Sequence, residues 1–421
     1  MTTQPKTTPI KYWIWLQQTV GRGALLEDML EAFPEGPEQI FRASVTERRI
    51  SGVFTPGMLQ KMEKTGLEVS YRILECCAKV GADPLSPDDR DYPDLLRELP
   101  DRPAVLYMKG DTRLINESLP FSIVGTRSAT RTSQHIAMDL SSTLTKSGML
   151  IVSGGALGID SAAHVGAMNA GGCTVCVLGS AIGSDYLKRN ESLRKCIAQH
   201  GVLLSELAPG LELNRGDFPK RNRLISGMSC GTLVVEAAIK SGSLNTAKWA
   251  MNQGKEVFAV PGEPGAAFQG SNELLRDGAV PVQCARDIWD TLLDIPMESA
   301  LYQYYIRHLN AKVPMEDLER QITRLSGSGT VSVDDFLQRE TERAERRERD
   351  ARMSLHRRPA GDELSEHARN VYACFTGAPL SLQDLQQKTD LSGNILMEAV
   401  SELEIYGYLQ VQPDRTYNFT V

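Results

Sequence analysis

From about residue 104 onward, short apolar segments alternate with segments of helical periodicity. The apolar segments are rich in Val, Ile and Leu, and glycines stand where several of them end. This pattern is typical of a parallel sheet with crossover helices. It predicts strands at 105–108, 121–124, 149–153, 174–178, 202–205, 232–235, 256–260 and 280–283. Between them it predicts helices at 133–145, 160–170, 191–199 and 244–252.

The alternation therefore predicts an α/β domain with a doubly wound parallel sheet over residues 101–293. Ligands of such sheets bind beyond the carboxyl ends of the strands. Gly125, Arg127, Gly154 and Gly155 lie at or near such ends. We expect a binding site on that edge of the sheet.

Residues 1–100 show a helical pattern instead. Trp13, Trp15 and Leu16 recur at the spacing of a helix face, and the turn Gly21–Gly23 interrupts the segment. We predict a small domain of several short helices. Two roles remain open for it, because helical modules with glycine turns can grip a DNA backbone or serve only as docking domains.

The segment 294–362 reads as a charged linker. Residues 326–329 are Ser-Gly-Ser-Gly, and 334–352 are dense in Glu and Arg with few apolar positions. Glutamates cancel the arginine charge, which argues against a basic arm for nucleic acid. We predict a solvated helix or a disordered tether.

The last stretch, 363–421, is typical of a winged helix. Ala368, Val371, Tyr372 and Phe375 fall on one helix face, Ser381 and Ser392 are expected N-caps, and 408–419 reads as a hairpin. In a helix-turn-helix the third helix reads DNA. Here it carries Glu398, Glu402 and Glu404 and no Lys or Arg between residues 392 and 404. We therefore expect this domain to contact protein.

Composition limits the classes of protein that fit. A chain of 421 residues exceeds one typical domain. No apolar segment reaches the roughly 18–20 residues of a membrane span, and the N-terminus is polar, so we expect a cytoplasmic protein. The net charge of −7 confines any nucleic-acid site to a local basic patch.

The cysteines are scattered along the chain, and we expect them to be reduced residues of the core. Cys173 and Cys176 have redox spacing but fall in a predicted strand, where they face opposite sides.

Gly154, Gly155 and Gly158 follow a predicted strand and open a predicted helix. Glycines there let the backbone approach a phosphate, and the helix N-terminus favours an anion. A dinucleotide site needs an acidic residue at the end of the next strand, but residues 178–180 are Leu-Gly-Ser. The chain also lacks a P-loop motif. We expect a phosphate cradle without a nucleotide cofactor.

Cationic and aromatic residues gather around this cradle. Arg127 follows the preceding strand, and residues 218–223 read Phe-Pro-Lys-Arg-Asn-Arg. Arginine grips phosphate with its planar fork, and an unstacked base can lie on the Phe218 ring. Alternatively, Arg221 and Arg223 pair with Glu206 or Glu236 inside the fold. Ser243 and Thr246 open another helix, where their hydroxyl groups either cap it or bind a phosphate.

The remaining candidate chemistry is weak. Asp160 and His164 are four residues apart on one predicted helix, but no third metal ligand is in view, so we expect a cap and a core-edge histidine. Ser153 does not stand in a Gly-x-Ser-x-Gly motif, and no paired carboxylates stand out. We predict no catalytic residue and no metal.

Taken in order, these motifs resemble one family. Gly125-Thr-Arg127, Ser153 to Asp160, Ser205-Glu206, Phe218 to Arg223, Val235-Glu236, Ser241 to Thr246 and Val260-Pro-Gly262 closely resemble the DNA-processing protein A family (DprA, also called Smf). The resemblance is strong over about 90–290. It is looser for a sterile-alpha-motif-like N-terminal domain and a winged-helix C-terminal domain.

The resemblance implies a Rossmann-like fold and a protein without catalytic turnover. It also implies a homodimer that binds single-stranded DNA, protects incoming strands and loads the RecA recombinase during natural transformation. With the residues argued above, it gives a DNA-binding set of Arg127, Gly154, Gly155, Phe218, Lys220, Arg221, Asn222, Arg223, Ser243 and Thr246.

Two rival functions remain. The sheet also resembles nucleotide phosphoribohydrolases of the cytokinin-activating (LOG) type, whose loop contains Pro-Gly-Gly-x-Gly-Thr-x-x-Glu. Residues 228–236 lack the Pro-Gly-Gly, and Glu236 comes one residue late, which turns its side chain away from the expected direction. The other rival is an interaction scaffold built on the terminal domains, which would not bind oligothymidylate at low salt.

Overall fold

The computed structural model describes residues 8–186, 188–214, 216–294, 338, 342, 364–375, 380–405, 408–411 and 416–419. The predicted linker 294–362 lies outside the described residues except for Asp294, Gln338 and Glu342. The chain divides into two compact units, Met1–Leu337 and Gln338–Val421. Within the described part of the chain, no helix is long and apolar enough to cross a membrane.

The first unit opens with a group of helices: α1 (Ile10–Val20), α2 (Leu26–Ala32), α3 (Pro37–Arg42), α4 (Val45–Ile50), α5 (Pro56–Lys64) and α6 (Glu68–Val80). Helix α1 is central, since Trp13, Ile14 and Trp15 are almost fully buried. Ser44 begins α4 with a capping box that includes Glu47. Trp13, Ile14 and Trp15 belong to the same hydrophobic core as residues on one face of the following sheet. The helices therefore pack as part of the same unit.

The rest of the unit alternates strands and helices. Its strands are β1 (Asp83–Leu85), β2 (Leu106–Gly110), β3 (Leu119–Val124), β4 (Met149–Ser153), β5 (Thr174–Leu178), β6 (Val202–Ser205), β7 (Gly231–Val234), β8 (Glu256–Ala259) and β9 (Val280–Pro281). Its helices are α7 (Asp94–Arg97), α8 (Arg113–Asn116), α9 (Arg131–Lys146), α10 (Ile159–Asn169), η1 (Lys188–Asn190), α11 (Glu191–His200), α12 (Asp217–Gly227), α13 (Gly242–Asn252), α14 (Gln269–Arg276) and α15 (Ala285–Leu293).

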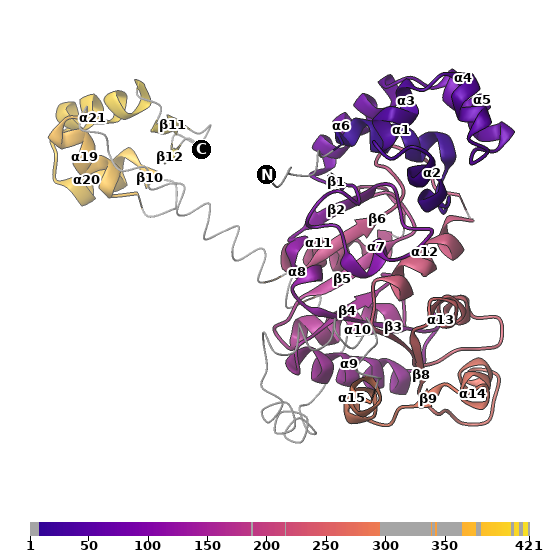
Figure 1. The fold of residues 1–421 in the computed structure, drawn as a ribbon. Helices are drawn as coiled ribbons and strands as arrows, with labels where there is room; N and C mark the ends of the chain where they lie inside the picture. The colour runs from indigo at the N-terminus through magenta and orange to yellow at the C-terminus, as the bar shows by residue number, and fades with distance from the viewer. Residues whose placement is uncertain are drawn as a thin grey trace, which may run out of the picture. The chain divides into compact units, whose positions relative to one another are not determined.

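Within the described residues these strands form one nine-stranded sheet in the order β1-β2-β6-β5-β4-β3-β7-β8-β9 (Figure 1). Strands β3 to β9 pair in parallel, as predicted. The prediction of a wholly parallel sheet is wrong at one edge, where β2 runs antiparallel to β1 and to β6. Residues 86–105 join β1 to β2, and their helix α7 has only four residues, which is shorter than the helix of a usual parallel crossover. The sheet is therefore mixed.

The sheet is covered on both faces because successive residues of each strand point to opposite sides. Ile151 belongs to the core shared with α9, α10, α11 and α15. Its neighbours Leu150 and Val152 belong to a second core, with residues of α7, α12, α13 and α14. This two-sided burial explains why the strands read as continuous apolar segments.

The second unit is a small helical domain with its own sheet. It contains α19 (Glu366–Ala373), β10 (Leu380–Ser381), α20 (Leu382–Thr389), α21 (Gly393–Ile405), β11 (Leu409–Val411) and β12 (Thr416–Phe419). Its described strands pair in the order β10-β12-β11, so the expected hairpin forms. Ser381 begins α20 with a capping box, as predicted. Ala368, Val371 and Phe375 are buried in its core.

Candidate nucleic-acid interface

A cavity of about 410 Å³ lies beyond the carboxyl ends of β3, β4 and β7. The chain runs outward from β3 through β4 and β5 to β6, then returns to the other side of β3 to form β7. The cavity thus lies where the strand order reverses, the usual ligand position in such sheets. It is lined by Val124, Gly125, Thr126, Arg127, Ala156, Asp160, Phe218, Pro219, Arg221, Asn222, Ile225, Ser241, Gly242, Ser243, Asn245 and Thr246.

Arg127 and Phe218 meet at this cavity. Arg127 is exposed and Phe218 is half-buried. The guanidinium carbon of Arg127 lies 5.6 Å from the centre of the Phe218 ring, within cation–π distance. The ring also packs against Gly179, where an added Cβ would lie 2.6 Å from Phe218 Cδ1. An exposed cation and an aromatic ring therefore lie together at the cavity.

Tyr186 extends this aromatic contact. Its ring centre lies 5.1 Å from that of Phe218, and the two rings are tilted by 44°. Tyr186 was not among the predicted site residues, because a single tyrosine in a loop carries no periodic signal. One lysine and one arginine follow it, Lys188 and Arg189, and both are exposed. This cluster of an aromatic and two basic residues is the sequence pattern from which Tyr186 could have been predicted as a site residue.

Residues 218–223 belong to helix α12, which the sequence analysis did not predict as a helix. Lys220 is exposed and does not line the cavity. Asn222 does line it, and its Nδ2 donates to Gly242 O at 3.2 Å and to Asn245 Oδ1 at 3.3 Å. The residues of the predicted motif therefore point in different directions. Phe218, Arg221 and Asn222 face the cavity, and Lys220 faces solvent.

Arg221 lines the cavity but is largely buried, with 7% of its surface exposed. Its Nη1 donates to Gly154 O at 2.6 Å and also to Val177 O. Its Nε has no hydrogen-bond partner among the described residues. Burial lowers the pKa of Arg221, while Asp160 acts in the opposite sense. Arg221 thus braces two strand ends and leaves little of its charge accessible from the cavity.

Asp160 supplies the matching negative charge. It is 6% exposed, and its Oδ2 accepts from the Ala156 backbone N–H at 3.2 Å. Burial raises the pKa of this carboxyl group, and Arg221 is the largest opposing influence. Asp160 therefore holds the loop between β4 and α10. The predicted helix cap is wrong, because the N-cap of α10 is Gly158 and makes no side-chain cap hydrogen bond.

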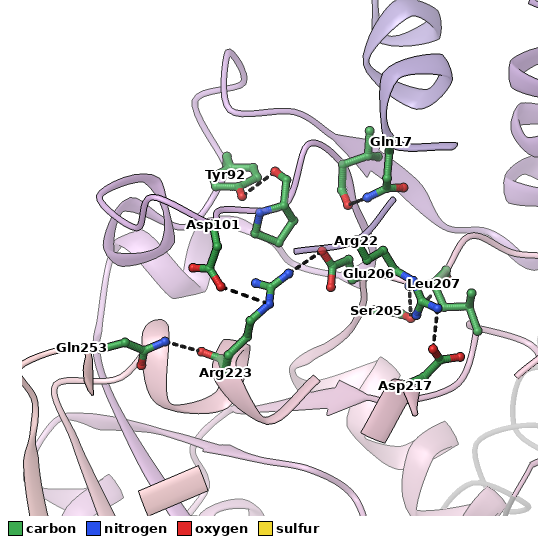
Figure 2. A network of polar contacts seen from close by, with 12 residues as sticks. Gln17, Arg22, Tyr92, Asp101, Ser205, Glu206, Leu207, Asp217, Arg223 and Gln253 are labelled. Carbon is green, nitrogen blue, oxygen red and sulfur yellow. Dashed lines mark hydrogen bonds and ion pairs between the residues drawn. The ribbon is translucent and has the colours of Figure 1, made fainter. Parts of the chain in front are cut away.

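Arg223 does not lie in the cavity. It is 2% exposed, and its guanidinium pairs with Glu206 at 2.6 Å and with Asp101 at 3.4 Å (Figure 2). Burial raises the pKa of Glu206, while Arg223 and then Arg22 oppose that rise. This is the internal pairing of Arg223 with Glu206 that was the alternative to a DNA contact. The guanidinium is enclosed by carboxylates, so we leave Arg223 out of the DNA contact set.

Gly154 and Gly155 are buried and do not line the cavity either. A Cβ on Gly154 would lie 2.4 Å from Arg221 Nη1 and 2.8 Å from Asp160 Oδ2. At Gly155, where φ is +68°, a Cβ would lie 2.4 Å from Cys176 Sγ. Both glycines are needed to pack Arg221, Asp160 and Cys176, which is a different reason from the phosphate approach that the sequence suggested.

Hydroxyl groups at the N-terminus of α13 form the opposite wall. Ser241 caps the helix by accepting from the Ser243 N–H, and their Oγ atoms lie 2.8 Å apart. Ser243 and Thr246 are buried yet line the cavity. This eleven-residue helix begins at the cavity, so its first N–H groups favour an anion there.

The other chemical candidates are structural. His164 is fully buried, and its Nδ1 lies 2.8 Å from Thr174 Oγ1, which itself donates to Ile151 O. Glu236 accepts from the N–H and the hydroxyl of Thr130, at the start of α9, and does not line the cavity. The described residues contain no group of His, Cys, Asp and Glu that could hold a metal ion.

The fold and this cavity define an α/β protein with an anion-favouring pocket at the strand ends of a mixed sheet. The chain matches the DNA recombination-mediator protein A family over residues 84–293, and it belongs to that family.

Solved and curated relatives agree with this assignment. The chain is 37% identical to DNA processing protein DprA of Bacillus subtilis over 222 residues, which are 52% of this chain and 75% of that protein. It is 36% identical to Protein Smf of Synechocystis over 293 residues, 68% of this chain and 73% of that protein. The X-ray structure of DprA from Streptococcus pneumoniae covers 68% of this chain and 98% of its own, with 29% identity and a TM-score of 0.58.

Proposed function

We propose that the protein binds single-stranded DNA at the cavity beyond the carboxyl ends of β3, β4 and β7. The observation that carries this proposal is the pairing of exposed Arg127 with the Phe218 ring at the cavity. Phosphates need mobile cations, and unpaired bases need an aromatic face. The Arg127 guanidinium and the Phe218 ring lie here in contact with each other.

The contacts divide by chemistry. Arg127 and Lys220, both exposed, would neutralise phosphates on either side of Phe218. Asn222, Ser243 and Thr246 would offer hydrogen bonds from the cavity wall, beside the N-terminus of α13. Arg221 would act from the cavity wall through its largely buried charge. Gly154 would support the site by making room for that arginine, and Gly155 by making room for Cys176.

Membership of a recombination-mediator family supports a wider role. We infer that the protein works as a homodimer in the cytoplasm, protects incoming single strands and delivers them to the RecA recombinase in natural transformation. The sheet domain would be Rossmann-like, and residues 363–421 a winged helix. Its helix α21 carries Glu398, Glu402 and Glu404. Glu402 accepts from Ser365 N and Oγ, so its charge also holds α19. We expect this acidic domain to contact protein.

A nucleotide phosphoribohydrolase has weaker support. That reading relied on Glu236 as the acidic residue of the loop. Glu236 is 2% exposed and its carboxylate is engaged with Thr130. Incubation with AMP should therefore release no free adenine, and release of adenine would restore this alternative.

The proposal is tested by titrating the protein with oligothymidylate. Affinity should fall with rising salt by about 0.7 log units per log unit of salt for each phosphate neutralised. A protein that binds no oligothymidylate at low salt would contradict the proposal and favour the scaffold reading.

A further inference from the structure

We propose that Arg22, in the N-terminal helical module, is a positioning residue for the DNA-binding face of helix α12. The inference rests on the proposed function, since it assigns Arg22 a part in the same site without direct contact to the ligand. Arg22 lies in the turn Gly21–Gly23 between α1 and α2, far in sequence from the sheet. It is not among the residues that line the cavity.

Arg22 holds the first residue of α12. Its Nη2 lies 2.5 Å from Asp217 Oδ1, and the two side chains are 19% and 5% exposed (Figure 2). Asp217 Oδ2 accepts from the Asn214 N–H at 2.8 Å, and the Asp217 N–H donates to Asn214 O at 3.0 Å. A carboxylate this buried needs a charged partner, because desolvation is costly without one. Arg22 is the cation paired with Asp217 in the described structure.

The same turn also reaches the middle of the helix. A Cβ added to Gly23 would lie 3.8 Å from Arg223 Nε, so the Gly23 backbone packs beside the buried Arg223 ion pairs. Gly21 and Gly23 have φ values of +88° and +77°, which favour glycine. The turn Gly21–Gly23 therefore contacts α12 near both Asp217 and Arg223.

These contacts are made by residues of α12 that do not line the cavity. Phe218, Arg221 and Asn222 line the cavity, whereas Asp217 and Arg223 face the helical module. The residues before α12 give little support, because Leu211, Glu212, Asn214 and Gly216 are exposed. Helix ends fray when they lack buried contacts. Without Arg22, the first turn would be free to move, and Phe218 with it.

The positioning role predicts a specific effect of Arg22→Gln on DNA binding. Affinity for oligothymidylate should fall about fivefold, which is close to 1 kcal/mol of lost preorganisation. The salt dependence should keep the wild-type slope, because no phosphate contact is lost. Arg127→Ala should instead reduce the slope. A flatter slope in Arg22→Gln would mean direct contact with DNA and would overturn the positioning role.

Arg102→Gln is the matched control. Arg102 Nη1 pairs with Glu27 Oε2 at 2.7 Å, so this pair also joins the helical module to the sheet domain. Arg102 Nη1 also donates to Leu99 O at 3.3 Å, and neither partner belongs to α12. Loss of the Arg102–Glu27 pair should leave the affinity for oligothymidylate unchanged. An equal loss of affinity in both variants would show that any weakening of the module has the same effect, and the specific role of Arg22 would be refuted.

Two more variants keep the test independent of folding. Arg22→Lys retains the charge and should restore most of the affinity. Asp217→Asn should weaken binding, and combining it with Arg22→Gln should cost little more, since both remove the same pair. Wild-type affinity in Arg22→Gln and Asp217→Asn, or additive losses, would overturn the inference. If the wild-type protein itself bound no oligothymidylate, the proposed function would fail first.

Discussion

The Arg127 guanidinium lies over the face of the Phe218 ring, with 5.6 Å between its central carbon and the ring centre. Arg127 follows β3, whereas Phe218 lies in α12, so the sheet brings together two residues about ninety positions apart. In free protein the ring holds the arginine near the cavity. A bound strand would then find a cation and a stacking surface already in place, which lowers the ordering cost of binding.

Arg127→Ala should weaken the binding of oligothymidylate and reduce the salt slope by about 0.7, the contribution of one phosphate on a single strand. Fluorescence anisotropy at several salt concentrations measures both quantities. Arg286→Ala is the control, because Arg286 is an exposed arginine that pairs with Asp290 on α15, away from the cavity. An unchanged slope in Arg127→Ala would remove this arginine from the interface.

Phe218→Ala should weaken binding by about 1–3 kcal/mol, the usual contribution of a stacked base, while the salt slope stays near that of the wild type. Phe218→Tyr keeps an aromatic face and should bind nearly as well as the wild type. Titration of both variants with the same oligonucleotide checks this expectation. Equal losses in the two variants would contradict a stacking role for the ring, because tyrosine keeps the aromatic face.

Arg223→Met should lower the free energy of unfolding by about 3–5 kcal/mol, because it leaves the buried Glu206 carboxylate without its cation. Urea unfolding measures the loss. Folded Arg223→Met should keep the wild-type salt slope, since the enclosed guanidinium meets no phosphate. A reduced slope with normal stability would return Arg223 to the DNA-binding set.

Gly154→Ala should destabilise the protein by about 1–3 kcal/mol, because the new methyl group would press on Arg221 and Asp160 in a packed wall. Gly57→Ala, in helix α5, is the control: no atom lies within 4 Å of its added Cβ. Thermal unfolding compares the two. Equal stability in both variants would show that Arg221 has room to move.

Acid should destabilise the protein through His164. Burial lowers the pKa of His164 to about 3, whereas the unfolded chain titrates near 6.5. Between those values the unfolded state binds the proton and the folded state does not. Stability therefore falls with falling pH by up to about 1.4 kcal/mol per pH unit from this residue. Its Nε2 has no hydrogen-bond partner among the described residues, so an added proton would be unpaired there.

His164→Gln should remove that contribution. The raised pKa values of Asp160 and Glu206 act in the opposite direction, since those groups favour the folded state as they are protonated. The informative quantity is therefore the difference in unfolding free energy between His164→Gln and wild type across pH. A difference that does not vary between pH 6.5 and the acid limit would contradict the assignment.

The strands were predictable because a sheet buried on both faces leaves continuous apolar segments, as at Ile151 and Val152. Helix α12 was missed because its first turn is polar and contains Pro219, which a helix tolerates only near its start. The antiparallel edge at β1 and β2 was missed because a short apolar segment does not indicate in which direction its strand runs through the sheet.

The site was predictable only in part. Arg127 and Phe218 meet at the cavity as their residue types suggested. The burial of Arg223 depends on Asp101 and Glu206, and the local sequence around 223 contains no sign of either partner. The N-terminal helical module was open to two roles, contact with a DNA backbone or docking. The described contact of Arg22 with Asp217 favours docking against the sheet domain.

The most direct test of the account compares single-stranded with double-stranded oligonucleotides of equal length across a salt series. We predict binding to the single strand, weaker binding to the duplex, and a salt slope that Arg127→Ala reduces by about 0.7. Equal affinity for both forms, or a slope that Arg127→Ala leaves intact, would contradict the claim that this cavity captures an unpaired strand.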